Sequence, residues 1–442
     1  MPIPQPLTDC DLLLTADLAL TQDSGRRVLE KAAIAVHDGR IAALGSQEEL
    51  AHLRPGERLD LGRSLIMPGL INAHTHCPMT FFRGLADDMP LEEWLTRYIF
   101  PNEQRLTAEI TEMGALIGCA EMTRFGCTAF ADMYLFEDSV AAAADKSGLR
   151  VLLGEAVFSF PTPASPGYEA AHEKVRAQVL RYKGHSRLRV AVMPHTVYTA
   201  GADVLRASAE LAAELGLPLH IHLSETGREV RACLEENGLR PLAYCRELGL
   251  LGPSTTFAHC VMLNEEELDE IAASGAKVAH NPGSNMKLAS GVAPVPAMLR
   301  RGILPGLGTD GAASNNSLNL FMEMRACALL HKVYSQDPTV CTAQEVLDMA
   351  TLGGASALGW PELGRLVPGC PADLIALDLT SPNLLPVYNP VSLPAYSACG
   401  QEVRLCMVEG RILYKDGAYL ALDHLSLIRE ADKLARWARA KL

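Results

Sequence analysis

Histidine and carboxylate side chains recur along the chain at the ends of short apolar segments. The first pair, His74 and His76 in GLINAHTHCPMT, lies directly after an apolar run with one residue between them. In a β-strand, residues i and i+2 point to the same face, so this spacing can present two imidazoles to one metal ion. The same segment could equally be an ordinary strand with two packed histidines, so other residues have to decide.

Five more ionisable residues occupy similar positions farther along the chain. A single histidine after a strand-like segment is more often a packed or surface residue than a metal ligand. If the segments are parallel strands of one barrel, however, their carboxyl ends meet at one face, and the coincidence is hard to attribute to chance. These residues are His195, His222, Glu225, His259 and Asp310.

Together these side chains predict hydrolytic chemistry at a metal ion. Three imidazoles and one carboxylate suit a divalent ion of intermediate softness, with Zn²⁺ first and iron or manganese as alternatives. An ion with one open position lowers the pKa of its bound water toward neutrality and thereby supplies hydroxide. Asp310 could bind the metal and accept a proton, Glu225 could shuttle protons, and His259 could polarise the attacked centre.

The elements that would position these residues alternate between strands and helices. Segments such as 107–126, 202–216 and 265–275 carry the apolar stripe and polar face of amphipathic helices. Eight such units in about this span favour a closed (β/α)8 barrel of the TIM type over an open doubly wound sheet. The expected strands are 69–76, 128–134, 150–158, 188–196, 218–225, 256–262, 277–281 and 304–310.

The two ends of the chain read as short strands instead. Near the C-terminus, a strand-like segment around Asp373 precedes a hairpin that turns at Glu409-Gly410. The strand-like segments at the two ends therefore predict one small β-sandwich, to which each end contributes strands. The expected N-terminal strands are 11–17, 28–36, 40–45 and 64–67.

These patterns divide the chain into four parts. Residues 1–66 and 367–424 are expected to form the β-sandwich, 67–366 the barrel and 425–442 a C-terminal amphipathic helix. We interpret one stripe of that helix as a packing face. The stripe consists of Leu425, Ile428, Ala431, Leu434 and Trp437.

The composition restricts the class of protein. A formal charge of −13 without clustered Lys and Arg argues against binding to nucleic acid. Neither a signal peptide nor an apolar stretch of transmembrane length is expected, and twelve cysteines without CxxC pairs argue against a disulfide scaffold or a thiolate zinc site. We expect a cytoplasmic enzyme with a small-molecule substrate and no membrane partner, and self-association into a homo-oligomer stays open.

Four motifs now carry a family resemblance. HTH, HLSET, AHC and GTDGAASNNSLNLFMEMR, in this order, resemble the amidohydrolase superfamily. Within it, the chain looks like the deaminases of methylthioadenosine and S-adenosylhomocysteine, which are related to triazine chlorohydrolases. The resemblance runs from about Asp11 to the C-terminal hairpin. It implies a metal site formed by His74, His76, His222 and Asp310.

The resemblance also implies roles in catalysis and substrate binding. Glu225 would protonate the ring nitrogen beside the attacked carbon and assist the departure of ammonia, and His259 would support the hydroxide. Glu103, in PNEQRLT, and His195 match positions that bind the nucleoside in the family. Taken alone, Glu103 precedes a predicted helix and could simply favour the start of that helix.

Two departures within the family refine these expectations. Two-metal members carry a lysine on the fourth strand, where this chain offers His195, so we predict one metal per chain. Members that bind the homocysteine carboxylate are expected to use arginines after the third strand, but segment 151–169 contains none and offers Glu155. Phe158 and Phe160 in that segment suit a methylthio or deoxy group better.

We therefore expect an aminohydrolase that deaminates an adenosine-type nucleoside. The first candidate substrate is 5′-methylthioadenosine, followed by S-adenosylhomocysteine, adenosine and 5′-deoxyadenosine. Hydrolysis of a triazine or another nitrogen heterocycle needs the same ligands, so it remains an alternative. A nicotinamide oxidoreductase would use the GxGxxG of Gly306, Gly308 and Gly311, but that match leaves the histidines unexplained. A non-catalytic barrel scaffold should have lost ligands, and none of the expected ones is missing.

Overall fold

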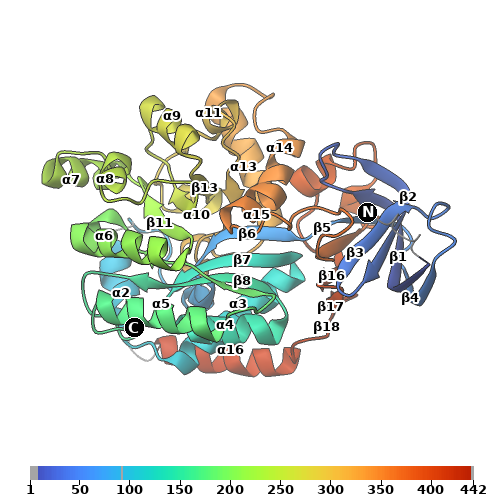
Figure 1. The fold of residues 1–442 in the computed structure, drawn as a ribbon, viewed down its shortest axis with the longest axis horizontal. Coiled ribbons are helices and arrows are strands. Elements are labelled where there is room, and N and C mark those ends of the chain that lie inside the picture. Colours follow the sequence, from blue (N-terminus) through green and yellow to red (C-terminus); the bar gives the residue numbers. More distant parts are fainter. Residues whose placement is uncertain (1–7, 91–92, 440–442) are drawn as a thin grey trace.

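The computed structural model describes residues 8–90 and 93–439. A barrel of parallel strands surrounded by helices forms most of the chain, and a β-domain lies at one side of it (Figure 1). Both predicted parts of the fold are therefore present. Among the described helices, none combines the length and the hydropathy that a membrane span requires.

Two parallel sheets close into the barrel. Their strands are β6 (Leu70–Thr75), β7 (Cys127–Tyr134), β8 (Arg150–Val157), β9 (Leu188–Val190), β10 (Met193–Pro194), β11 (Leu219–Leu223), β12 (Thr255–His259), β13 (Lys277–His280) and β14 (Gly306–Leu307). One sheet has the order β10-β8-β7-β6 with β9 beside β8, and the other has the order β11-β12-β13-β14. A parallel bridge between Val192 and Leu219 joins them on one side. On the other side, the Asp310 backbone N–H donates to the carbonyl of His74 (3.0 Å), which brings β14 against β6.

Helices between the strands form the outer layer of the barrel. Several begin with a side-chain cap, and α9 has a capping box in which Asn264 and Glu267 bind each other's backbone N–H groups. The longer helices are α3 (Ala108–Arg124), α4 (Glu137–Ser147), α5 (Tyr168–Arg181), α6 (Val197–Leu215), α7 (Gly227–Asn237), α9 (Glu265–Ser274) and α13 (Leu320–Ser335). The shorter ones are α2 (Phe100–Glu103), α8 (Pro241–Glu247), α10 (Pro282–Lys287), α11 (Val295–Arg300), α12 (Ala312–Asn315), α14 (Ala343–Asp348) and α15 (Gly354–Ala357), with single turns η1 (Cys77–Phe82), η2 (Trp94–Ile99), η3 (Met349–Gly353), η4 (Pro382–Leu384) and η5 (Leu393–Ser397).

Strands from both chain ends share one sheet in the β-domain. They are β1 (Asp9–Leu20), β2 (Val28–His37), β3 (Arg40–Ser46), β4 (Arg54–Asp60), β5 (Ser64–Pro68), β15 (Leu374–Asp378), β16 (Val403–Val408), β17 (Arg411–Lys415) and β18 (Ala418–Tyr419). The order is β18-β17-β16-β15-β5-β1-β2-β3, with β4 paired to β1. The antiparallel pairing of β5 with β15 is where the two ends meet. The predicted hairpin turn lies between β16 and β17, where Glu409 and Gly410 both have positive φ.

A buried arginine ties the barrel to the β-domain. Arg150, the first residue of β8, is 2% exposed and binds both carboxylate oxygens of Asp373, at 2.6 and 3.1 Å. Its remaining Nη1 donates to the carbonyl of Ser186 (2.7 Å) and lies 3.2 Å from Glu409. Because Asp373 directly precedes β15, this one side chain connects the wall of the barrel with the C-terminal strands.

The C-terminal helix α16 (His424–Arg439) runs along the barrel beneath α3 (Figure 1). The predicted packing stripe is wrong in its first half, because Leu425 and Ile428 are 65% and 49% exposed. Leu434 and Trp437 do pack, and the Trp437 ring lies 5.6 Å from that of Phe81 in η1. The docked face is rotated from the predicted stripe and also includes Leu427 and Ala438, while residues 440–442 lie outside the described part.

Candidate active site

The ionisable residues singled out at the strand ends converge at one end of the barrel. The ligand atoms of His74, His222, His259 and Asp310 all lie within 4.8 Å of one another, and all four side chains are buried. His76 reaches the same point, because its Nε2 lies 3.2 Å from Asp310 Oδ1 and 3.4 Å from His222 Nε2. Strands that are distant in sequence thus present four imidazoles and a carboxylate to one small volume.

Hydrogen bonds at Nδ1 turn the Nε2 atoms of these histidines toward the centre. His222 Nδ1 lies 2.7 Å from the carbonyl oxygen of His195, and His76 Nδ1 bonds the carbonyl oxygen of Met133. When Nδ1 carries the proton and donates it to a carbonyl, Nε2 keeps a lone pair that can bind a metal. The other two contacts join His74 Nδ1 to His220 Nε2 (3.0 Å) and His259 Nδ1 to Asn285 Oδ1 (2.9 Å).

Asp310 is oriented in the same manner by two hydroxyl groups. Ser284 and Ser314 donate to its Oδ2 at 2.6 and 2.7 Å, so Oδ1 remains to face His74 and His76. The backbone of Asp310 has φ 61°, and that of His259 has φ 71°. Both values lie in the left-handed region that non-glycine residues rarely adopt, and such strain clusters at functional sites.

The charges of the centre are arranged around the Asp310 carboxylate. Burial tends to raise its pKa, but the close imidazoles of His74 and His76 outweigh burial and hold it well below its usual range. Burial lowers the pKa of His74 to about 4. For His76, burial is outweighed by the hydrogen bond and charge of Asp310, which raise the pKa to about 9. A metal that binds here must therefore displace a proton that Asp310 favours on His76.

The donor set fits a single divalent cation. His74 Nε2 is buried and has no hydrogen-bond partner among the described residues, although it points at Asp310 from 3.5 Å. Facing imidazole lone pairs and a carboxylate repel one another unless a cation lies among them, and this mixture of ligands suits an ion of intermediate softness. His195 directly follows β10 in the fourth barrel strand, and its Nδ1 lies 2.8 Å from Thr199 Oγ1.

Glu225 lies just beyond β11 at the rim of this centre. Its Oε2 is 3.9 Å from His259 Nε2, and its Oε1 accepts a hydrogen bond from Ser290 (3.1 Å). The backbone N–H groups of Ser224 and Glu225 both donate to the carboxylate of Glu229 at 2.8 Å. The loop is thereby fixed with the Glu225 carboxylate at the edge of the histidine cluster.

A small cavity of about 80 Å³ opens onto the centre. Glu103, the last residue of α2, lines it, and burial raises the pKa of this carboxyl although the Tyr134 hydroxyl counteracts the rise. Glu103 does not lie in the first turn of α3, where it could favour the start of that helix, because it ends α2 and Thr107 caps α3. Most of the wall is apolar and includes Trp94, Leu95, Ile99, Met133, Phe158 and Leu288.

No arginine or lysine lines this cavity within the described part of the chain. Glu155 does not face the cavity either, because its carboxylate accepts hydrogen bonds from the backbone N–H groups of Phe136 and Glu137. Lys174 lies 3.5 Å from it. Glu155 is therefore a buried structural residue, and the wall around a bound substrate would be neutral apart from the acids and histidines named above.

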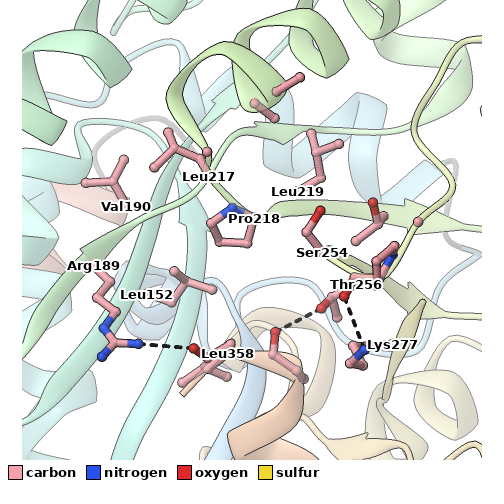
Figure 2. Close-up of a pocket in the computed structure, with 18 of the residues that line it drawn as sticks. Leu152, Arg189, Val190, Leu217, Pro218, Leu219, Ser254, Thr256, Lys277 and Leu358 are labelled. Atoms are coloured by element: carbon pink, nitrogen blue, oxygen red, sulfur yellow. Dashed lines mark hydrogen bonds between the residues drawn. The ribbon is translucent and has the colours of Figure 1, made fainter. Parts of the chain in front are cut away.

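A larger cavity of about 960 Å³ lies at the opposite end of the barrel, around the first residues of β9, β11, β12 and β13 (Figure 2). Three of its polar side chains donate to backbone carbonyls: Arg189 to Gly359 (3.1 Å), Thr256 to Ala357 (2.9 Å) and Lys277 to Pro253 (3.1 Å). In barrel enzymes the amino-terminal face serves stability and the carboxyl-terminal face carries the chemistry. We therefore assign the reaction to the smaller cavity.

The glycines of GxGxxG serve close packing. A Cβ at Gly306 would lie 2.6 Å from Ala73 Cβ, and one at Gly308 would lie 2.3 Å from Asn281 Oδ1. A Cβ at Gly311 would lie 2.8 Å from Met79 Sδ. These glycines thus allow β14 and its following turn to pack against β6 and β13, and the segment does not form a phosphate-binding turn.

Several residues that support the centre were not singled out in the sequence. His220 is the clearest, because the alternation in PLHIHLSET places His220 and His222 on one face of β11 and could have indicated a second ligand or support. Ser284, Asn285 and Ser314 carry no such signal. Their types are common on surfaces, and only the folded chain brings them to Asp310 and His259.

A barrel of this kind, with a His/Asp centre at its carboxyl end, belongs to a class of metal-dependent hydrolases. The chain is a member of the amidohydrolase family, whose profile matches residues 65–413, and the predicted family is thereby confirmed.

Individual relatives are similar over nearly the whole chain. The 5-methylthioadenosine/S-adenosylhomocysteine deaminase of Nitratidesulfovibrio vulgaris strain DP4 is 56% identical over 439 residues, which cover 99% of this chain and 98% of that one. The 5′-deoxyadenosine deaminase of Methanothermobacter thermautotrophicus is 42% identical over 410 residues, 92% of this chain and 95% of that one. A solved structure of an adenosine deaminase from Xanthomonas campestris with bound zinc has a TM-score of 0.96 and 34% identity, covering 98% of this chain and 100% of that one.

Proposed function

We propose that this enzyme hydrolytically deaminates an adenosine-type nucleoside to the inosine analogue and ammonia. The observation that carries the proposal is the cluster of four imidazoles and Asp310 at the carboxyl end of the barrel, with the carboxylate of Glu225 at its rim. The relatives support it, because three that match almost the whole chain are named as deaminases of adenosine or its derivatives.

We propose one metal ion in this centre, Zn²⁺ first, held by His74, His76, His222 and Asp310. When it is bound, such an ion supplies a hydroxide nucleophile near neutral pH. His76 is preferred over His259 as a ligand because its Nε2 lies closer to Asp310, whereas His259 Nε2 faces Glu225. The zinc named in the Xanthomonas campestris structure supports the choice of metal, and Fe²⁺ or Mn²⁺ would suit the same ligands.

The remaining residues would perform the proton transfers. Asp310 accepts a proton from the attacking water, and His259 supports the resulting hydroxide and polarises the attacked carbon. Glu225 would protonate the adjacent ring nitrogen and then take up the proton of the newly added hydroxyl group, while Asp310 would return its proton to the amino group, which leaves as ammonia. The contacts of the Glu225 carboxylate with Ser290 and His259 hold it in place and so support this role in proton transfer.

Glu103 and His195 would bind the nucleoside. Glu103 is a carboxylate in an apolar wall, so it can accept hydrogen bonds from sugar hydroxyls, and His195 stacks against Phe158 with ring centroids 4.6 Å apart. Trp94, Leu95 and Ile99 of η2 line this cavity of about 80 Å³, so η2 would lie against a bound substrate. The absence of lining cations favours an uncharged 5′ substituent, as in 5′-methylthioadenosine or 5′-deoxyadenosine, over the homocysteine carboxylate.

Three further expectations are kept as proposals. A cytoplasmic location is supported by the twelve cysteines, all of which are free thiols in the structure. The division into residues 1–66 with 367–424, 67–366 and 425–442 is supported by the strands that both ends contribute to one sheet. A homo-oligomer stays open.

Ammonia release from a substrate panel tests the proposed function. The zinc-loaded enzyme would be assayed with 5′-methylthioadenosine, 5′-deoxyadenosine, adenosine, S-adenosylhomocysteine and an aminotriazine. We expect fast release from the first two and much weaker release from S-adenosylhomocysteine, because its carboxylate lacks a cationic partner. Release from the triazine alone, with none from any nucleoside, would contradict the proposal and favour the alternative function.

A further inference from the structure

A second group of metal-binding side chains lies between β13 and α13, apart from the active centre. Ligand atoms of His280, Cys327 and His331 all lie within 4.8 Å of one another. His280 is the last residue of β13, whereas Cys327 and His331 are four residues apart on α13 and therefore share one helix face. All three side chains are at most 1% exposed, so this group belongs to the interior of the protein.

The two imidazoles face each other through their Nε2 atoms at 3.2 Å. Neither Nδ1 has a hydrogen-bond partner among the described residues. A group that donates to Nδ1 would fix the proton of that ring on Nε2, and no such donor is present among the described residues. Two facing lone pairs need either a proton or a cation between them. The separation is close to the edge of a tetrahedron with metal–nitrogen bonds of about 2.0–2.1 Å, which is about 3.3 Å.

The charge states of these groups suit a soft cation. Burial lowers the pKa of His280 well below its usual range and that of His331 to about 4, so both rings are neutral ligands at pH 7. A hydrogen bond with the thiol of Cys341, together with burial, raises the pKa of Cys327. The Cys327 thiol would therefore lose its proton only when a cation binds.

Neighbouring residues hold the group in place. Lys332 donates to the carbonyls of Val340 and Cys341, at 2.6 and 2.8 Å, and so fixes the loop that carries Cys341 against α13. Glu323, one turn before Cys327 on the same face of α13, is a buried carboxyl that can balance added positive charge.

We propose that His280, Cys327 and His331 form a second metal site, which binds a thiophilic ion of the zinc class and joins α13 to β13. The site is structural and does not depend on the proposed deaminase activity. Its ion would hold the end of β13, where the next residue, Asn281, lies 3.4 Å from His259 Nδ1 through its side-chain amide. The sequence predicted one metal per chain, and this proposal adds a second, structural ion outside the active centre.

Cobalt substitution tests the second site. The full chain would be produced in cells supplied with Co²⁺ as the added transition metal, so that the ion is present while the protein folds. Only a thiolate ligand gives the near-ultraviolet sulfur-to-cobalt charge-transfer band, and the active centre offers only nitrogen and oxygen. We expect two cobalt ions per chain and this band in the wild type.

Matched variants then show which cysteine gives rise to the charge-transfer band. Cys327→Ser should lose the band and one ion per chain, whereas Cys399→Ser, which changes an exposed cysteine, should keep both. Asp310→Ala should lose the other ion and keep the band. A wild-type protein that holds a single cobalt ion without the band would overturn the proposal and leave a shared proton between the histidines, and this result does not require any variant to fold. Loss of the band in Cys341→Ser together with its retention in Cys327→Ser would also overturn the assignment.

Discussion

At the scale of single residues, Glu225 offers the most direct test of the proposed chemistry. The Glu225→Gln change keeps the size of the side chain and its contact with Ser290 but removes the proton transfer. We expect an unchanged metal content and a fall in turnover of roughly a hundredfold or more. Ammonia release and metal analysis by mass spectrometry measure both. Ser290→Ala is the control, for which we expect a much smaller loss of turnover. Wild-type turnover in Glu225→Gln would show that Glu225 does not have the assigned role.

Asp310 should behave differently, because its carboxylate is expected to hold the metal as well as a proton. In Asp310→Ala, the centre loses the carboxylate that contacts His74 and His76, so we expect loss of the catalytic ion and of activity together. Metal titration followed by calorimetry measures the affinity. Ser314→Ala, which removes one hydrogen bond to Asp310, should keep the ion. Wild-type affinity in Asp310→Ala would exclude the residue as a ligand.

The residues that the sequence could identify share one property. His74, His222, His259 and Asp310 follow apolar segments whose parallel pairing brings their ends together, so position along the strands was enough. The residues that form hydrogen bonds with these side chains could not be identified in this way. Ser284 reaches Asp310 from α10, and Asn285 reaches His259 from the same helix, through contacts that no local pattern encodes. The left-handed backbone of His259 and Asp310 likewise depends on the folded surroundings.

At the scale of elements, Glu323 joins three helices and makes stability depend on pH. Its carboxylate on α13 accepts hydrogen bonds from the Gly283 N–H of α10 and the Asn315 amide of α12, both at 2.8 Å. Burial nevertheless raises its pKa from 4.5 to about 7. The folded state then binds the proton more tightly than the unfolded state, so this group lowers stability as the pH rises from 4.5 through 7.

The Glu323→Gln change should flatten that dependence. We expect the free energy of unfolding of the wild type to fall by up to about 3 kcal/mol more than that of the variant between pH 4.5 and pH 8. Urea unfolding of both proteins at these two pH values measures the difference. An identical pH dependence in the two proteins would show that folding does not raise the pKa of Glu323.

Elements with a regular apolar period were predictable, and those shaped by their neighbours were not. Strand β4 was missed because RPGERLD contains Pro55, Gly56 and several charges, and it is defined only by pairing with β1. The fourth barrel strand, predicted as one segment, is divided into β9 and β10, with Val192 between them bridging to Leu219. The first half of α16 carries an apolar stripe that the barrel does not cover, so periodicity alone gave the wrong face.

At the scale of the whole molecule, Arg150 links the barrel to the β-domain through its buried ion pair with Asp373. Arg150→Met leaves Asp373 buried without its partner, so we expect the free energy of unfolding to fall by about 3–5 kcal/mol. Chemical denaturation measures this loss. The exposed pair of Arg246 and Glu270 provides a control, since Arg246→Met should cost about 0–1 kcal/mol. Adding Asp373→Asn to Arg150→Met should recover part of the loss, and equal effects of the two arginine changes would contradict this account.

The sheet shared by both chain ends has a consequence for the order of events during synthesis. Strand β5 is complete once Pro68 has left the ribosome, but its partner β15 begins only at Leu374, after every strand of the barrel has been made. Because domains fold as they emerge, the edge of β5 stays open while the histidines of the candidate site are already being brought together. The nascent chain would therefore expose one unpaired edge until nearly the end of translation, and a ribosome stalled before β15 should carry a barrel that attracts chaperones at that edge.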